Sequence, residues 1–186
     1  MSTPVLSDVP SLIAAHMRAA VARNDFLHTA ALTYLPGPGV ATLAAQLREV
    51  VAALPAGARI HLVGHSLGGI LARWFALESN DPRVVATISL ASPFGGVPTA
   101  AWLGVPAVRD LRPDSAVLRR ILLHPDAARV PHLSIVAGAD TLLQSPVSHA
   151  LPGGDVLVME GRGHNTLLFD DEVARAVEQR VLATRR

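Results

Sequence analysis

The chain has 186 residues, half of them hydrophobic and 17% charged, and 16 basic against 15 acidic side chains give a formal net charge of +1. This composition argues against a disordered chain and against a nucleic-acid binder. All the basic residues are arginines, which excludes Schiff-base lysine chemistry and a phosphate-binding P-loop lysine. The lack of cysteine excludes disulfides, zinc–thiolate sites and a cysteine nucleophile within these residues. The length fits a single domain over residues 1–186.

Neither a membrane span nor a secretory leader is expected from the sequence. Charged residues, prolines or glycines interrupt every apolar stretch before it reaches the length of a transmembrane helix. Residues 1–10 contain Asp8 and no basic side chain, unlike the start of a signal peptide. We therefore expect a cytoplasmic protein, and the pattern leaves its oligomeric state open.

Helical and extended patterns alternate along the chain. Apolar spacing predicts helices over residues 11–24, 40–54, 66–79 and 170–183. Short apolar runs predict strands over residues 28–35, 59–63, 84–90, 133–137 and 156–159. This alternation predicts an α/β fold with a mostly parallel central sheet of about six strands, flanked by helices. Residues 97–131 contain five prolines and a weak helical pattern over 115–123, which predicts a small insertion over the sheet.

The sequence Gly64-His65-Ser66-Leu67-Gly68 lies between a predicted strand and a predicted helix. This is the G-x-S-x-G pattern of a nucleophile elbow, a sharp turn that lifts the serine hydroxyl clear of the sheet. Side chains two residues on either side of the serine are expected to collide, which predicts a need for glycine at 64 and 68. The N–H of Leu67 opens the following helix and is the expected first donor of an oxyanion hole. A glycine-rich turn with a capping serine is the structural alternative.

A serine nucleophile needs a histidine base and an acid that orients the histidine. Asp140 follows the predicted strand 133–137, and His164 follows the predicted strand 156–159. Their order after Ser66 is the one that this type of elbow uses. Active sites of parallel sheets gather at the C-terminal ends of the strands, so we expect Ser66, Asp140 and His164 to meet there.

Other histidines and aspartates compete less well for these roles. His149 is the main rival of His164, but no predicted strand precedes it. Asp126 precedes a predicted strand, and Asp155 lies at the entry end of one, so neither is expected to face the site. Asp140 could also be a simple turn residue, because aspartate is common in turns.

These motifs resemble the α/β-hydrolase superfamily, and within it the small bacterial lipases and esterases, over most of the chain from about residue 11. The segment Gly64–Gly69 is similar to the lipase elbow, and residues 88–96 are similar to the strand and loop that follow it. The resemblance departs at the N-terminus, where no His-Gly pair precedes the first helix. We predict that residues 4–7 form a truncated central strand, after which the N–H of Asp8 or Val9 supplies the second oxyanion donor.

The resemblance implies a serine hydrolase that cleaves carboxylic esters through a Ser–His–Asp triad and an acyl-enzyme intermediate. Its partner would be a small-molecule ester or acyl substrate, with no metal, cofactor or nucleic acid involved. Phe94 and Trp102 are candidate substrate-binding residues, with core packing as the alternative. Thioesterase and acyltransferase chemistry use the same triad, and a catalytically impaired binding protein is the third alternative.

Overall fold

The computed structural model describes residues 19, 27–32, 34, 37–98 and 105–183. The strand predicted at residues 4–7 and the helix predicted at 11–24 therefore lie outside the described residues, apart from Ala19. Within the described part of the chain, no helix is long and apolar enough to cross a membrane.

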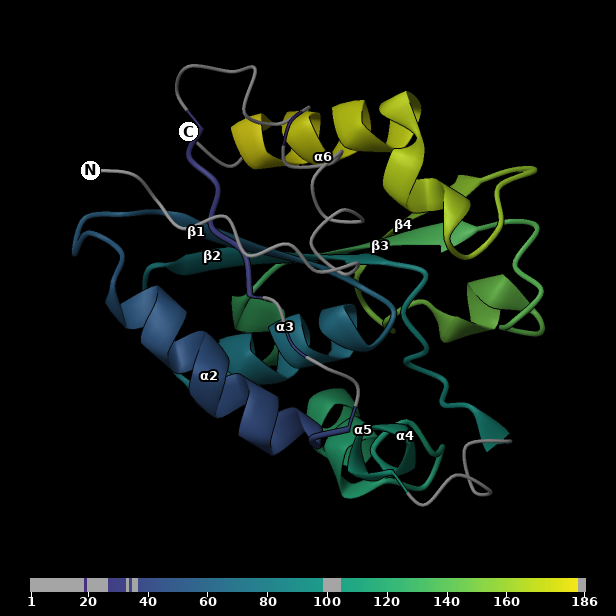
Figure 1. Cartoon of the computed structure of the whole chain (residues 1–186), viewed down its shortest axis with the longest axis horizontal. Coiled ribbons are helices and arrows are strands. Elements are labelled where there is room, and N and C mark those ends of the chain that lie inside the picture. Colours follow the sequence, from purple (N-terminus) through teal and green to yellow (C-terminus); the bar gives the residue numbers. More distant parts are fainter. Residues whose placement is uncertain (1–18, 20–26, 33, 35–36, 99–104, 184–186) are drawn as a thin grey trace.

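A parallel sheet of four strands forms the centre of the described structure (Figure 1). Its strands, which are adjacent in the order of the chain, are β1 (Ile60–His65), β2 (Val84–Leu90), β3 (His132–Ala137) and β4 (Asp155–Met159). Every pairing is parallel, as predicted. The register aligns His65 with Leu90 and Ala137 with Met159, so the C-terminal ends of the strands form one edge of the sheet.

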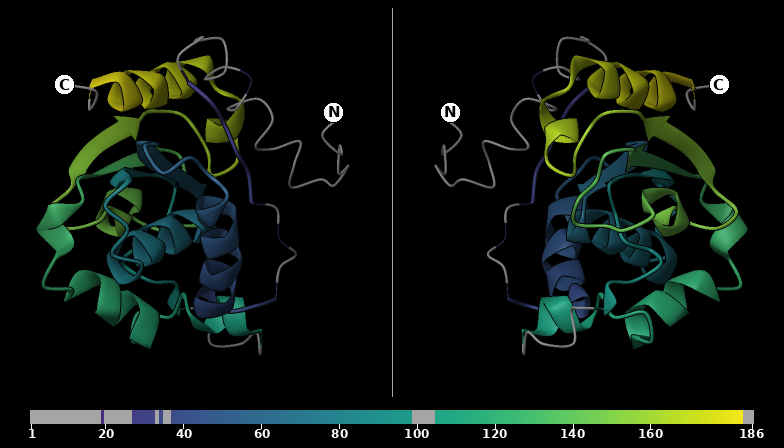
Figure 2. Two further views of the ribbon diagram at one scale, coloured as in Figure 1. Left: turned by 90° about the vertical axis from the view of Figure 1, so that its left-hand side faces the viewer. Right: turned by 90° about the vertical axis from the view of Figure 1, so that its right-hand side faces the viewer.

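Helices cover both faces of this sheet (Figures 1 and 2). One face carries α2 (Val40–Ala52), α3 (Leu67–Glu78) and α5 (Ala116–Leu122), and the other carries α6 (Asp171–Ala183). Each face has its own hydrophobic core. Ile70 and Phe75 of α3 contribute to the first core, and Ile88 of β2 packs with Val173 and Val177 of α6 in the second. Burial of β2 on both faces explains its nearly continuous apolar sequence.

The prediction of about six strands is wrong for the described residues, which form four. Residues 28–35 were expected to form a strand, but their described members, 28–32 and 34, have no strand assignment. Leu27 packs against the α6-side core, whereas Leu32 and Tyr34 pack against the α3-side core. Within the predicted strand, Leu32 and Tyr34 thus share one core, and this packing accounts for their apolar character without the hydrogen-bonded ladder that defines a strand.

The described part of the predicted insertion is residues 97–98 and 105–131, and its longer segment contributes to the α3-side core. It contains α4 (Pro106–Arg109), α5 and the short 3-10 helix η2 (Ala127–Arg129). The helix predicted at 115–123 is confirmed as α5, and Ser115 caps it by accepting a hydrogen bond from the Leu118 N–H at 3.1 Å. Leu118 and Ile121 are buried in the core that α3 also enters.

Candidate active site

Ser66 occupies the junction between β1 and α3, with φ 53° and ψ −120°. Positive φ is rare for a residue with a side chain, and such strained positions cost on the order of 1–3 kcal/mol and cluster at functional sites. The turn is held by the Ser66 N–H, which donates to the carbonyl of Leu90 at 2.8 Å, and by the Gly69 N–H, which donates to the carbonyl of Ser66 at 3.1 Å. Leu67 is the first residue of α3, so its N–H has no acceptor within the helix.

The elbow requires glycine at 64 and 69 rather than at 64 and 68. A Cβ atom on Gly64 would lie 2.1 Å from the carbonyl carbon and oxygen of Gly68. One on Gly69 would lie 2.0 Å from Ser92 Oγ, because α3 packs closely on the end of β2. The prediction for Gly68 is wrong, since its Cβ would make only an ordinary contact, 3.5 Å from Tyr34 Oη.

This contrast predicts opposite effects for two similar substitutions. Gly64→Ala is expected to lower the free energy of unfolding by at least about 2 kcal/mol, because the new methyl group meets backbone atoms that cannot move aside. Gly68→Ala is expected to leave it unchanged or to raise it by up to about 1 kcal/mol, as alanine favours a helix. Urea denaturation measures the free energy of unfolding of each variant. Equal destabilisation by the two substitutions would contradict this account of the elbow.

Asp140 and His164, which lie in the loops after β3 and β4, are in direct contact. His164 Nδ1 lies 2.7 Å from Asp140 Oδ2, and the Asp140 side chain is fully buried. The other carboxylate oxygen of Asp140 accepts hydrogen bonds from the N–H groups of Leu142 and Leu143, at 2.8 and 2.9 Å. These contacts fix the carboxylate so that Oδ2 forms the hydrogen bond with the imidazole Nδ1. The second ring nitrogen of His164, Nε2, is then available to accept a proton.

Backbone contacts hold the two loops together. The Ala139 N–H, one residue before Asp140, donates to the carbonyl of Arg162, two residues before His164, at 2.9 Å. Arg162 in turn pairs with Asp170 at 2.8 Å and with Glu172 at 2.9 Å, at the start of α6. The histidine loop is thus anchored both to the aspartate loop and to a helix.

His65, the residue before Ser66, connects the elbow to His164. Its Nε2 lies 3.0 Å from the backbone carbonyl of His164, and the two rings are 4.8 Å apart in an edge-on arrangement. Because a carbonyl only accepts, the proton of His65 must be on Nε2. Burial is the main cause that lowers the pKa of His65 to about 4, so this ring is neutral at pH 7. Sequence reasoning missed this contact, which joins residues 99 positions apart.

Ser66, Asp140 and His164 therefore follow the C-terminal ends of strands at one edge of the sheet, and His65, next to Ser66 in the chain, contacts His164. The hydrogen bonds of the described residues do not include the expected one between Ser66 Oγ and His164 Nε2. Catalytic hydrogen bonds are often long or poorly aligned without substrate. His149, the rival base, instead places Nε2 3.1 Å from the carbonyl of Gln144.

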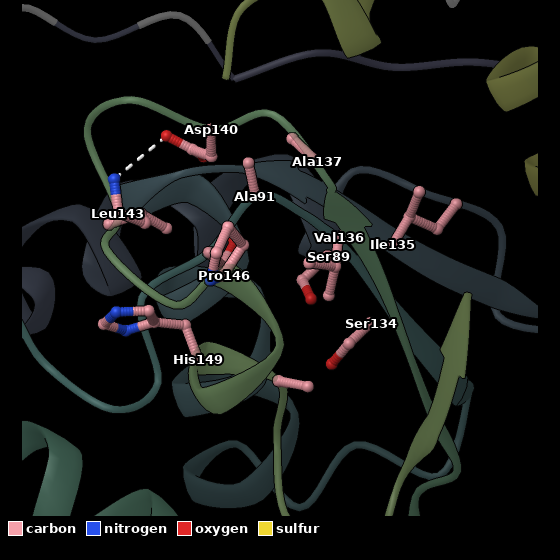
Figure 3. A pocket seen from close by; sticks show the side chains of 12 residues that line it. Ser89, Ala91, Ser134, Ile135, Val136, Ala137, Asp140, Leu143, Pro146 and His149 are labelled. Atoms are coloured by element: carbon pink, nitrogen blue, oxygen red, sulfur yellow. Dashed lines mark hydrogen bonds between the residues drawn. The ribbon is translucent and has the colours of Figure 1, made fainter. Parts of the chain in front are cut away.

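A small cavity of about 10 Å³ lies beneath the aspartate loop. Figure 3 shows Asp140, Leu143, Pro146 and His149 around it, with the hydrogen bond from the Leu143 N–H to Asp140. This volume is about that of a single water molecule. It is too small for an organic substrate, which would have to approach Ser66 from another side.

Of the remaining predicted site residues, only Phe94 lies within the described residues. Phe94 is 1% exposed and meets the ring of His132 edge-on, with 5.2 Å between centroids, which favours core packing. Trp102 and the two proposed oxyanion donors, Asp8 and Val9, lie outside the described residues.

Comparison with known proteins identifies the family and supports the fold. Residues 17–112, slightly more than half of the chain, match the family described as alpha/beta hydrolase fold. No curated protein matches the sequence. Among solved structures, the chain is similar to the Bacillus licheniformis lipase BlEst2 in mature form, with 18% identity, a TM-score of 0.63, and coverage of 81% of this chain and 77% of that one.

Two further structures extend the likeness over more of this chain. The metagenomic carboxyl esterase MGS0156 has 21% identity and a TM-score of 0.67, covering 90% of this chain and 67% of its own. The pyrethroid hydrolase PytH has 17% identity and a TM-score of 0.65, covering 95% of each chain. At these identities the likeness establishes the fold. On the family match and this fold, the chain belongs to the alpha/beta hydrolase fold family.

Proposed function

We propose that this protein is a serine hydrolase that cleaves carboxylic esters. The observation that carries the proposal is the Asp140–His164 hydrogen bond of 2.7 Å, formed beside the elbow that holds Ser66. Lipase, carboxyl esterase and pyrethroid hydrolase are the names of structures that share the fold, which supports an ester as the substrate.

The geometry suggests how each residue would act. Ser66 Oγ attacks the ester carbonyl carbon, and His164 Nε2 takes the hydroxyl proton. Asp140 keeps the proton of His164 on Nδ1 and stabilises the imidazolium that forms. His164 then protonates the leaving alcohol, and the acyl group stays on Ser66 until water, deprotonated by His164, releases it as a carboxylic acid.

The negative charge that develops on the carbonyl oxygen needs preorganised donors. The Leu67 N–H is the first, since it opens α3 and has no acceptor within that helix. The second donor in this proposal is the N–H of Asp8 or Val9. Loss of one such donor typically lowers kcat by about 10²–10³-fold.

Hydrolysis of p-nitrophenyl butanoate tests the proposal. We expect turnover with an initial burst of nitrophenol equal to the concentration of active sites whenever deacylation is slower than acylation. A butanoyl thioester measured in parallel separates esterase from thioesterase activity, with the higher kcat/KM expected for the oxygen ester. Complete inactivity of the folded protein toward a panel of activated esters would contradict the proposal.

His65 is expected to position His164 rather than to touch the substrate. His65→Phe keeps a planar ring but removes the Nε2–H donor, so we expect kcat to fall about tenfold with KM nearly unchanged. His65→Gln, which retains an N–H donor, should recover part of the loss. The matched control is His149→Phe, which removes a comparable contact to a carbonyl, that of Gln144. Equal losses in the two phenylalanine variants would contradict a positioning role.

A further inference from the structure

A second cavity, of about 220 Å³, lies at the opposite end of the sheet from Ser66. It is bounded by the end of α5, by η2, by the entry to β3 and by residues 151–154 before β4. Ile121, Leu122, Val130 and Leu151 give it apolar walls, and among the described residues that line it Arg73 of α3 has the only ionised side chain. Its position at the N-terminal ends of β3 and β4 separates it from the triad residues, which follow the C-terminal ends.

Arg73 is an unusual member of this lining because, within the described part of the chain, its guanidinium forms hydrogen bonds but no ion pair with an acidic side chain. The residue is 2% exposed. Its Nη1 donates to Thr87 Oγ1 and to the carbonyl of Val130, and its Nη2 donates to the carbonyl of Ala127. All three acceptors are neutral oxygens. A guanidinium has five N–H groups, and Nε is buried here without a hydrogen-bond partner.

The surroundings leave this positive charge uncompensated. None of the lining residues within the described ranges is aspartate or glutamate. His132, which also lines it, is hydrogen-bonded through both ring nitrogens to Thr87 and Ser89. Burial, with the nearby charges of Arg73 and Arg180, lowers the pKa of His132 to about 3, so this ring is neutral at pH 7 and adds no second positive charge. A buried charge is costly unless an opposite charge or sufficient hydrogen bonds balance it.

We propose that this cavity binds a small aliphatic carboxylate, with the anionic group at Arg73 and the hydrocarbon chain against the apolar walls. A guanidinium binds the planar carboxylate through directed N–H···O bonds, which suits a ligand with one charged end. The volume is below the range of about 300–1,000 Å³ typical for drug-sized ligands, so a short chain fits best. This inference does not depend on the ester hydrolysis proposed above.

Isothermal titration with sodium hexanoate at constant ionic strength tests the charge requirement. We expect millimolar binding of hexanoate, and binding of its neutral analogue hexanamide weaker by about tenfold or more, which corresponds to about 1.4 kcal/mol. Inorganic phosphate should bind more weakly than hexanoate, because it cannot use the apolar walls. No hexanoate binding, equal binding of hexanamide, or preference for phosphate would each overturn the proposal.

Two neighbouring leucines give a matched pair of variants that locates the ligand without altering the buried arginine. Leu122 lines the cavity and is 41% exposed, so Leu122→Trp should fill the space while the protein stays folded. Leu123 is 80% exposed and does not line it. We expect Leu122→Trp to raise the Kd for hexanoate about tenfold or more and Leu123→Trp to leave it unchanged. Unchanged binding in Leu122→Trp would place hexanoate elsewhere, such as near Ser66, and overturn the proposal.

Discussion

Ser66→Ala is expected to lower kcat for ester hydrolysis by at least about 10⁴-fold while leaving KM nearly unchanged. The substitution removes the only atom that forms the proposed acyl-enzyme bond. It keeps the backbone of the elbow, whose hydrogen bonds use the Ser66 N–H and carbonyl rather than the side chain. Steady-state kinetics on p-nitrophenyl butanoate, with circular dichroism to verify folding, measures the effect.

Ser92→Ala is the matched control for this loss. Ser92 lies close to the elbow, where its Oγ would be 2.0 Å from a Cβ on Gly69, but it has no role in the proposed reaction. The Ser92→Ala variant should have the same kcat as the unmodified protein. Residual activity of Ser66→Ala within tenfold of the unmodified protein would mean that another group carries the reaction.

Asp140→Asn is expected to lower kcat by about 10³–10⁴-fold, again with little change in KM. The carboxylate accepts the Nδ1 proton of His164 at 2.7 Å, whereas an amide can present an N–H there instead. That arrangement favours the tautomer with the proton on Nε2, which cannot accept the proton of Ser66.

Asp126→Asn provides the comparison for that variant. Asp126 is exposed and precedes η2, at the end of the sheet away from Ser66. The kcat of the Asp126→Asn variant should therefore equal that of the unmodified protein. Because Asp140 also accepts two backbone N–H groups, unfolding curves must accompany the kinetics. Full activity in a folded Asp140→Asn would remove this residue from the mechanism.

Features that depend on local sequence were predictable. The β2 strand follows from seven consecutive residues suited to a strand buried on both faces, and its predicted bounds match the structure. The approach of Asp140 to His164 was predictable from topology, because both residues follow strands of one parallel sheet and so lie at the same edge.

Features that depend on distant contacts were not predictable. Whether residues 28–35 form a strand depends on a neighbour to pair with, which their own pattern does not specify. The steric need for glycine at 69 comes from Ser89 and Ser92, which lie 20 and 23 positions further along the chain. Nothing in the sequence distinguishes Arg73 from the exposed arginines, since its burial depends on the carbonyls of Ala127 and Val130.

Labelling with a fluorophosphonate, followed by mass spectrometry of the peptides, tests the central claim most directly. The serine oxygen attacks phosphorus and displaces fluoride, so the reagent marks a nucleophile that a neighbouring base has activated. We predict one label per chain, on the peptide that contains Ser66, and none on folded Ser66→Ala. Labelling of a different residue, or persistent labelling of Ser66→Ala, would contradict the assignment of Ser66 as the nucleophile.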